Sequence, residues 1–372
     1  MKKGEKKIVF LLTNRKHSGV LKRVESFIES GYDVEIYGFD RGFGKEVASL
    51  KDIPIVDLGL VENGKSYWGK LLNAHHIFKN IFRKNSSSTI YYVFSFDFAL
   101  ICLISRKKYI YEIRDLVYGY FSSSIIVNIF KNIDKILIKL SLLTVVLSEG
   151  FVEFLYGKKR RENVIVQPNK IHFSFKGKAR PVLEFETKNE IVFGFIGALR
   201  FPNTIMRFAR IIGERFPNHK FLFFGDGIPE YKKMVEELVE KYQNIHFYGS
   251  FKNPDDLSSI YSKVDVSLSC YDSDFVNVQY AEPNKLYESI YFYTPIIVST
   301  KTFLGDKVNK LNVGFVIDAT LDDEIIKYVN NLSFEEINKI KNNMSTFDAV
   351  NLIDDRANVI ISRVNQFYNN EK

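Results

Sequence analysis

The 372-residue sequence contains only two cysteines, nine prolines and one tryptophan. Cys102 and Cys270 lie far apart in apolar runs, so they lack the paired spacing of a metal site. We expect both to be buried free thiols, which are typical of a reducing cytoplasm. The few prolines and the hydrophobic fraction of 46% exclude a disordered chain. A chain of this length should form about two domains.

Long apolar runs are also missing. None approaches the ~20 residues that cross a bilayer. The basic N-terminus resembles the start of a signal peptide, but its apolar stretch, residues 8–12, is too short and continues into Asn14-Arg15-Lys16. We therefore predict that residues 8–12 form the first strand and that the protein is cytoplasmic, with only peripheral membrane contact.

Several catalytic and cofactor motifs are absent. Residues 13–19, between the first strand and first helix, lack G-x-G-x-x-G, which argues against a nicotinamide or flavin site. No Ser/His/Asp or Cys/His arrangement indicates a hydrolase. Asp272-Ser273-Asp274 has no third ligand in view, so we expect neither a metal nor another cofactor.

Charge is distributed unevenly along the chain. Residues 1–180 contain 31 Lys and Arg against 17 Asp and Glu, a net charge of +14, whereas the remainder has a net charge of −6. The basic half therefore favours an anionic partner, which we expect to be a membrane surface or an acceptor and not a nucleic acid.

Two basic amphipathic segments are candidates for that contact. Residues 67–84 include Trp68 and Phe82. In residues 122–141, lysines recur every four positions, at Lys131, Lys135 and Lys139. Cationic and apolar side chains together suit a membrane interface. The alternative is that both segments are ordinary core-packing helices with solvated lysines.

Strands and helices alternate throughout the chain. A first β-α-β unit comprises strands at 8–12 and 34–38 and a helix that ends at Gly31. Further apolar runs predict strands at 90–94, 109–113, 142–147, 164–166, 191–196, 220–224, 245–248, 264–269, 296–299 and 313–317. This alternation predicts an α/β protein with two doubly wound parallel sheets. The first domain should span residues 1–170 and the second 191–349, with residues 171–190 as linker.

Residues 281–299, AEPNKLYESIYFYTPIIVS, combine a short helix with a buried strand. The helix N-terminus and Lys285 suit a phosphate. One turn further, Glu288 can accept two vicinal hydroxyls of a ribose. The alternative is an amphipathic helix with one exposed Lys and one exposed Glu.

The segment PNKLYESIYFYTPIIVS resembles GT-B glycosyltransferases, particularly the glycosyl transferases group 1 family of bacterial capsule, exopolysaccharide and O-antigen synthesis. The resemblance implies two Rossmann-like domains facing a cleft, with a tail at about residues 350–372 that crosses back to the first domain. It also implies that Glu288 binds the ribose of a nucleotide sugar. The family often has another Glu eight positions earlier, where this chain has Tyr280, and Glu282 is near enough to substitute.

Further residues are assigned through the same resemblance. The donor nucleotide would contact Gly197, Arg200, Gly225, Gly227, Ser250, Phe251, Lys285 and Glu288. The donor sugar would contact Ser18, Gly19, Asp274, Tyr280, Glu282 and Asn284. In the run EIRDL, Arg114 and Asp115 end a strand where catalysis is expected, and Asp115 would act as the base. Helix capping is the alternative for Asp115 and for Ser18.

The resemblance implies a glycosyltransferase of the hexosyltransferase type. The donor would be a UDP-, GDP- or dTDP-linked sugar, and the acceptor a glycan or a polyprenyl-diphosphate-linked sugar at the inner face of the plasma membrane. Two alternatives are a nucleotide-sugar epimerase of the same fold and a non-catalytic partner subunit of a transferase complex.

Overall fold

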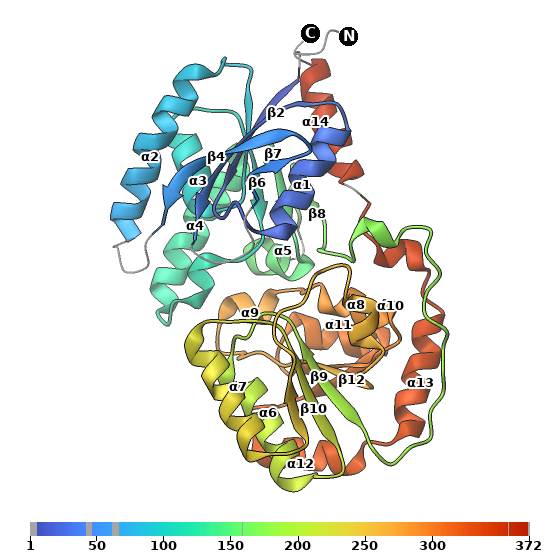
Figure 1. Cartoon of the computed structure of the whole chain (residues 1–372). Helices are drawn as coiled ribbons and strands as arrows, with labels where there is room; N and C mark the ends of the chain where they lie inside the picture. The colour runs from blue at the N-terminus through green and yellow to red at the C-terminus, as the bar shows by residue number, and fades with distance from the viewer. Residues whose placement is uncertain (1–5, 42–46, 62–66, 158, 356, 371–372) are drawn as a thin grey trace. The chain divides into compact units, whose positions relative to one another are not determined.

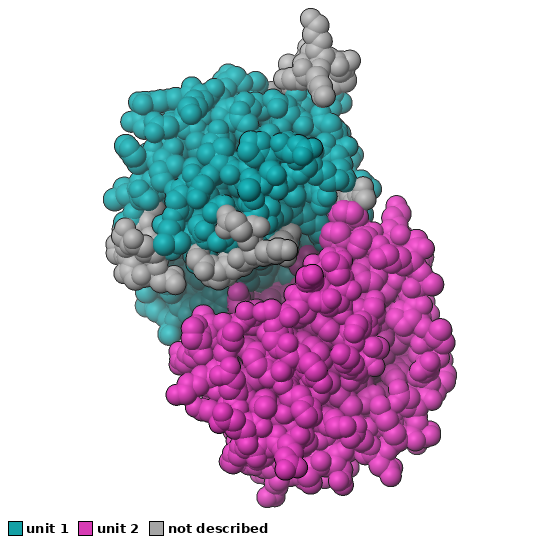
Figure 2. Space-filling view, in the orientation of Figure 1, with its two compact units in different colours: residues 1–168, 355–372 teal, residues 169–354 magenta. Residues whose placement is uncertain are grey.

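The structure is a computed structural model that describes residues 6–41, 47–61, 67–157, 159–355 and 357–370. It divides into two compact units (Figures 1 and 2). Unit 1 contains residues 1–168 and 355–372, and unit 2 contains residues 169–354. The stretch expected to link the domains, residues 171–190, lies entirely within unit 2.

Unit 1 is built on an eight-stranded sheet with the order β3-β4-β2-β1-β5-β6-β7-β8. Its strands are β1 (Lys7–Leu12), β2 (Asp33–Asp40), β3 (Ser49–Leu50), β4 (Ile53–Leu60), β5 (Ile90–Val93), β6 (Tyr109–Ile113), β7 (Leu143–Val146) and β8 (Val164–Val166). Its helices are α1 (Ser18–Glu29), α2 (Tyr67–Lys84), α3 (Phe96–Ile104), η1 (Val117–Tyr120), α4 (Ser124–Leu140), α5 (Glu149–Tyr156) and α14 (Asn358–Asn370). All neighbouring strands are parallel except β3 and β4.

Unit 2 is built on a six-stranded parallel sheet with the order β11-β10-β9-β12-β13-β14. Its strands are β9 (Val192–Ile196), β10 (Lys220–Phe224), β11 (Ile245–Phe247), β12 (Val266–Ser269), β13 (Ile296–Ser299) and β14 (Gly314–Ile317). Its helices are η2 (Phe173–Phe175), α6 (Pro202–Arg215), α7 (Pro229–Lys241), α8 (Leu257–Tyr261), α9 (Val276–Tyr280), α10 (Lys285–Tyr291), α11 (Phe303–Leu311), α12 (Asp322–Asn331), α13 (Phe334–Ser345) and η3 (Ala349–Leu352). The predicted fold class, two parallel-sheet α/β domains, is confirmed.

Local sequence explains where these elements begin and end. The central strands β6 and β7 are buried along their whole length, as expected for parallel strands covered by helices on both faces. The N-cap Ser95 accepts a hydrogen bond from the Phe98 amide at the start of α3. Pro202 and Pro229 occupy the first turns of α6 and α7, where the missing amide costs nothing.

Each sheet has one point at which the strand order reverses. In unit 2 the chain runs from β9 outward to β11 and returns to the other side of β9 at β12. In unit 1 the corresponding reversal lies between β1 and β5. Ligands of doubly wound sheets bind outside the carboxyl ends of the strands at such points. The turns that follow β9 and β12 are therefore the first places to look for a site in unit 2.

Residues 171–190 are fixed to unit 2 by specific contacts. Ile171 pairs with Ile353 in a parallel bridge. The guanidinium of Arg180 lies 4.0 Å from the centroid of the Tyr293 ring. It also donates hydrogen bonds to carbonyls at the ends of α10 and α13, those of Ile290, Tyr291, Met344 and Phe347. This stretch is therefore a packed part of unit 2 and not a free linker.

The C-terminal helix α14 packs in unit 1, with Ile360 and Val364 in the core beside β1 and β2. The Tyr368 hydroxyl donates to the Lys7 carbonyl at 2.7 Å. Both cysteines are buried and free, as predicted, and burial raises the pKa of each thiol. Among the described residues, no helix is both long and apolar enough to cross a membrane.

Candidate functional site

Three glycine turns lie against one another at the carboxyl ends of β9, β10 and β11. The Gly197 amide donates to the Phe224 carbonyl at 2.8 Å, and the Gly225 amide donates to the Gly249 carbonyl at 2.7 Å. Gly225 has a φ of 148°, and a Cβ there would lie 1.7 Å from the Gly197 carbonyl oxygen. Only glycine fits this position. Backbone therefore replaces side chains at this edge and leaves room for a ligand.

The neighbouring turns are held together through Asp226. The Asp226 carboxylate accepts from the Gly227 amide and the Ser250 hydroxyl, both at 2.9 Å. The Gly227 amide, followed by the Ser250 hydroxyl and Lys232, lowers the pKa of Asp226. Gly227 and Ser250 were predicted to bind the nucleotide. In the structure both hold the turn after β10 in place by donating to Asp226. Arg200 is exposed one residue beyond the buried Leu199.

Lys285 and Glu288 form a buried cluster in α10. The Lys285 ammonium lies 2.8 Å from Glu288 Oε2, and the Tyr261 hydroxyl donates to the same oxygen at 2.9 Å. Asn284 donates to Oε1. Glu288 is 1% exposed and Lys285 is 8% exposed. The expectation that both side chains of an ordinary helix would be exposed is therefore wrong, since the two residues neutralise each other inside the domain.

This cluster adjoins the glycine turns. The position where a Cβ of Gly197 would lie is 3.4 Å from Lys285 Cε. The predicted diphosphate turn and its proposed second cation are therefore brought together. A diphosphate at this place would compete with Glu288 for Lys285, and ribose hydroxyls would take up the carboxylate.

Glu282 belongs to a second buried cluster. Its Oε1 accepts from Lys307 at 2.6 Å and from the Tyr287 hydroxyl, whereas its Oε2 is buried without a hydrogen-bond partner. Burial, followed by the charge of Glu282, raises the pKa of Tyr287. Glu282 is thus a buried carboxylate with one unused acceptor oxygen.

The remaining predicted donor-sugar residues of unit 2 lie on the loop after β12 and around α9. Asp274 is exposed and Tyr280 is half-buried at the end of α9. Asp272 is buried and accepts from Asn203 and Thr204, both at 3.1 Å, and burial raises its pKa. Across the described part of the chain, no group of three or more His, Cys, Asp or Glu could hold a metal ion.

The first candidate cluster of unit 1 centres on Glu112, at the carboxyl end of β6. Arg23 of α1 lies 2.9 Å from Glu112 Oε2 and Arg114 lies 2.7 Å from Oε1. The Tyr92 hydroxyl donates to Oε2 at 2.6 Å. Burial alone would raise the pKa of Glu112, but Arg23 and Arg114 hold it below its ordinary value. Two guanidinium groups therefore share this one carboxylate.

Arg114 also reaches the start of α1, where it donates to the Gly19 carbonyl at 3.4 Å. A Cβ on Gly19 would lie 2.6 Å from Arg114 Nη2, so the glycine leaves space for the guanidinium. The Ser18 side chain lies outside the described residues. Asp115 is exposed on the loop before η1, whose N-cap position is Leu116.

The structure shows the surroundings of the predicted membrane residues. On α4, the Lys131 ammonium lies 4.1 Å from the centroid of the Phe154 ring, and that of Lys135 lies 5.9 Å from Tyr156. Lys139 alone of these three lysines is exposed. On α2, Phe82 is buried against Phe78 and Tyr91, and the Trp68 side chain lies outside the described residues.

The sequence reasoning missed several partners of these residues. Tyr261, Lys307, Arg23 and Tyr92 come from distant parts of the chain, and no local pattern marks them. Glu112 carried a usable signal, because a charged residue inside a buried strand requires a buried partner. Phe251, predicted to contact the base, packs partly buried against one of the two unit 2 cores.

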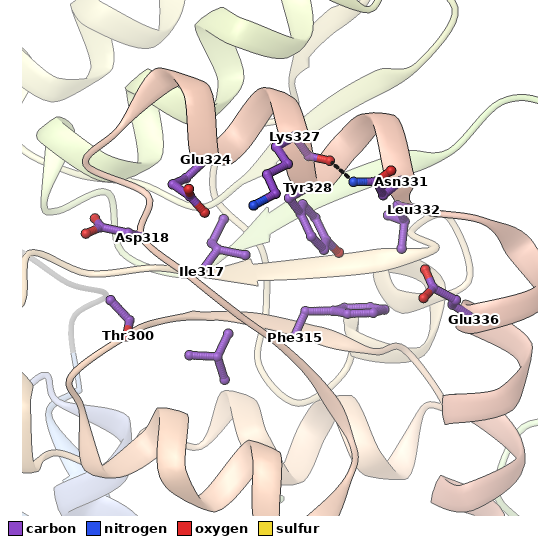
Figure 3. Close-up of a pocket in the computed structure, with 11 residues that line it drawn as sticks. Thr300, Phe315, Ile317, Asp318, Glu324, Lys327, Tyr328, Asn331, Leu332 and Glu336 are labelled. Atoms are coloured by element: carbon purple, nitrogen blue, oxygen red, sulfur yellow. Dashed lines mark hydrogen bonds between the residues drawn. The ribbon is translucent and has the colours of Figure 1, made fainter.

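A hollow of about 460 Å³ lies at the edge strand β14 of unit 2. Figure 3 shows Tyr328 and Lys327 of α12 above β14. The Phe315 and Tyr328 rings meet edge to face at 5.3 Å, and the Tyr328 hydroxyl is buried without a hydrogen-bond partner. None of the predicted site residues lines this hollow, so it is separate from the glycine turns.

Part of unit 2 matches a known protein family. Residues 178–346 match the family model described as Glycosyl transferases group 1. Residues 178–346 therefore form a glycosyltransferase group 1 domain. This domain contains the three glycine turns and both acidic clusters of unit 2. A search of curated proteins finds no match.

Solved structures resemble the whole glycosyltransferase chain. Anabaena HepE in complex with UDP and glucose is 14% identical with a TM-score of 0.65, over 98% of this chain and 99% of that one. Sucrose-phosphate synthase from Thermosynechococcus elongatus is 13% identical with a TM-score of 0.71, over the same shares. A structure described as trehalose-6-phosphate from E. coli, bound with UDP-2-fluoro glucose, is 12% identical with a TM-score of 0.62, over 97% of each chain. These neighbours have the GT-B fold, and with the domain match they indicate a glycosyltransferase.

Proposed function

We propose that this glycosyltransferase moves a hexosyl group from a nucleoside-diphosphate sugar to a growing cell-surface glycan of the capsule, exopolysaccharide or O-antigen type. The observation that carries the proposal is the Lys285–Glu288–Tyr261 cluster beside the Gly197 turn, inside a glycosyltransferase group 1 domain. A cation and a carboxylate at adjoining positions suit a diphosphate and a ribose, respectively.

The donor would be held mainly by unit 2. Lys285 and the exposed Arg200 would bind the diphosphate together with backbone amides of the turns, and Glu288 would accept the ribose hydroxyls. Of the three candidate bases, uracil is favoured because HepE and the E. coli neighbour are described with UDP or a UDP-sugar. The unused oxygen of Glu282 would accept a hydroxyl of the donor sugar.

The acceptor would be held by unit 1. Arg23 and Arg114, whose guanidinium groups meet at Glu112, would bind the diphosphate of a polyprenyl-linked acceptor. The exposed Asp115 follows directly and would remove the proton of the acceptor hydroxyl. The basic N-terminal half would associate with an anionic membrane surface, where such acceptors are found.

Calorimetric titration of the full chain with UDP, GDP and dTDP tests this proposal. One nucleoside diphosphate should bind at least about tenfold more tightly than the others, because base contacts add to the shared diphosphate contacts. Lys285→Ala should weaken that binding, and Lys310→Ala, a lysine on α11 outside both acidic clusters, serves as the matched control. If no nucleoside diphosphate binds the folded protein, the proposal is wrong.

Product analysis separates transfer from epimerisation. With a nucleotide sugar and a lipid-linked acceptor, a transferase releases the nucleoside diphosphate in proportion to acceptor consumed, whereas an epimerase returns an altered nucleotide sugar or sugar without an acceptor. Binding without either product would favour a non-catalytic partner subunit.

A further inference from the structure

Helix α4 of unit 1 has apolar side chains both on the face that points to the interior and on the face exposed to solvent. Val127, Leu137 and Ile138 face the interior together with Asp134. The opposite side carries Ile125, Ile129, Ile136 and Leu140, which are 72%, 54%, 51% and 54% exposed. These four residues follow one another at spacings of four, seven and four, so they share one face of the helix. We call them the α4 apolar stripe.

The turn before α4, which packs against the helix, also exposes apolar side chains. Val117 of η1 is 51% exposed and Phe121 is 45% exposed. The Phe121 ring lies 5.6 Å from the Phe130 ring of α4, so the turn packs against the helix. A soluble protein rarely exposes this many large apolar side chains on adjoining elements, and such a patch marks an interaction surface.

Charge indicates which partner covers the stripe. The described face of α4 exposes no carboxylate, because its one acidic residue, Asp134, is fully buried. Lys139 is exposed beside Leu140, and the half of the chain that contains α4 has a net charge of +14. An apolar helix face with an exposed lysine at its end and no exposed carboxylate suits the interfacial region of an anionic bilayer.

Position gives a second argument for a bilayer. The exposed apolar surface begins at Val117, two residues after the exposed Asp115. A lipid-linked acceptor held in the bilayer would therefore present its reacting end next to the residue proposed as base. This argument rests on the proposed function, since it takes the acceptor to be lipid-linked.

We infer that the α4 apolar stripe inserts into the interfacial region of the membrane and that this insertion, more than the lysines, holds the protein there. Lys131 and Lys135 already lie over aromatic rings of α5, which leaves Lys139 as the exposed lysine of the three on α4. Long-range charge then steers the approach, and buried apolar area supplies the lasting affinity.

Vesicle flotation of the full chain tests the inference, using phosphatidylcholine vesicles with and without phosphatidylglycerol, at low and high salt. Ile129→Gln/Ile136→Gln should reduce binding by about tenfold or more, because both side chains lose their insertion energy. Lys139→Gln should reduce it only severalfold, by roughly the effect of one lysine. Part of the wild-type binding to anionic vesicles should survive high salt.

The matched control is Val182→Gln/Val350→Gln, which changes two apolar residues of unit 2 that are 83% and 67% exposed and should bind like wild type. Ile125→Gln/Leu140→Gln provides a second test of the stripe if the first variant folds poorly by circular dichroism. All variants should bind the nucleoside diphosphate normally, since none alters unit 2 turns.

Three results would overturn the inference: wild-type protein that ignores all vesicles, stripe variants that bind like wild type, or binding that high salt abolishes completely. Sedimentation that shows wild-type dimers and monomeric stripe variants, without vesicle binding, would assign the stripe to a second copy. Normal flotation without nucleotide binding would instead remove the proposed function and leave the docking surface intact.

Discussion

Glu112 of unit 1 and Glu288 of unit 2 are both almost inaccessible to solvent, yet their surroundings differ in charge. Glu112 is bound by two arginines and a tyrosine. Glu288 is bound by one lysine, one tyrosine and one asparagine. Two cations therefore meet one carboxylate in unit 1, whereas one cation meets one carboxylate in unit 2. If unit 2 binds the proposed diphosphate through Lys285, the ligand must compete with Glu288 for that cation.

Asp134 is a buried carboxylate of unit 1 whose hydrogen-bond partners are tyrosines. Its Oδ2 accepts from the Tyr118 hydroxyl at 2.8 Å, and its Oδ1 has no hydrogen-bond partner. Burial raises its pKa to about 7, although hydrogen bonds from Tyr118 and Tyr111 oppose the shift. The contrast with Glu112 shows that the arginines, more than the hydrogen bonds, keep a buried acid ionised.

The largest expected effect is that of Glu112→Ala. This change leaves Arg23 and Arg114 buried without their carboxylate, and removal of one partner from a buried ion pair costs about 3–5 kcal/mol. Calorimetric melting should show a lower transition for unit 1 and an unchanged one for unit 2. Glu149→Ala, which alters a loose surface pair at 3.7 Å, is the control and should have almost no effect. Equal melting of the two variants would contradict a stabilising role for the cluster.

Asp134→Asn should change the pH dependence of stability. The folded carboxyl has a pKa of about 7 against an ordinary value of 3.8. Between these pH values the folded protein binds more protons than the unfolded one, so its stability falls as pH rises. The loss in wild type should reach about 4 kcal/mol by pH 8.

Urea denaturation from pH 5 to pH 8 measures the part of this loss that falls in that range, about 2.6 kcal/mol. Asp134→Asn should abolish that part of the pH dependence and make the variant the more stable protein at pH 8, since the amide keeps its acceptor oxygen for Tyr118. A wild type whose stability is independent of Asp134 across this range would show that the carboxyl finds a cation that offsets its burial.

Asp115→Asn tests whether the reaction in unit 1 depends on Asp115 itself and not on the neighbouring arginine cluster. The variant keeps the arginine cluster and removes the proposed base, so turnover should fall by about 100-fold or more. Affinity for the nucleoside diphosphate should stay unchanged, because Asp115 lies outside unit 2. Rates measured from pH 5 to pH 9 should lose the dependence that reports the base. Wild-type turnover in this variant would exclude Asp115 as the base.

Glu288→Gln should have the smallest effect. It tests whether Glu288 and a bound diphosphate compete for Lys285. Loss of a charge-assisted hydrogen bond, worth about 1.5–3 kcal/mol, should weaken nucleoside-diphosphate binding by tens of fold. Pyrophosphate, which has no ribose, should bind at least as well as before, because Lys285 has lost its competitor. Calorimetric titration with both ligands gives the answer, and a parallel loss for both would assign Glu288 a purely structural role.

The sequence predicted the fold class because its strands are short apolar runs that end at glycines or polar turns. Gly197, Gly225 and Gly249 mark three such ends, and the structure places them side by side. Lys285 and Glu288 were also selected, since their spacing on a helix puts them on one face. Their mutual pairing was not foreseen, because the sequence does not show which face is buried.

The same limitation applies to the lysines of α4. A period of four placed Lys131, Lys135 and Lys139 on one side, but apolar residues fill both flanks of that side. Only packing reveals that Lys131 and Lys135 rest on aromatic rings of α5, that Asp134 points inward and that isoleucines point outward. Partners such as Arg23 and Lys307 depend on contacts between distant segments, which no local pattern contains.

The bridge between Ile171 and Ile353 has a consequence for the order in which the two units fold during synthesis. The Asp354 amide donates to the Ile171 carbonyl at 2.8 Å, so the two ends of unit 2 are tied together and the unit is one uninterrupted stretch of chain. Unit 1 lacks this property, because α14 fills part of its core. On the ribosome, unit 2 can finish folding as soon as residue 354 emerges. The domain that is synthesised first must wait for the last helix before its core can close.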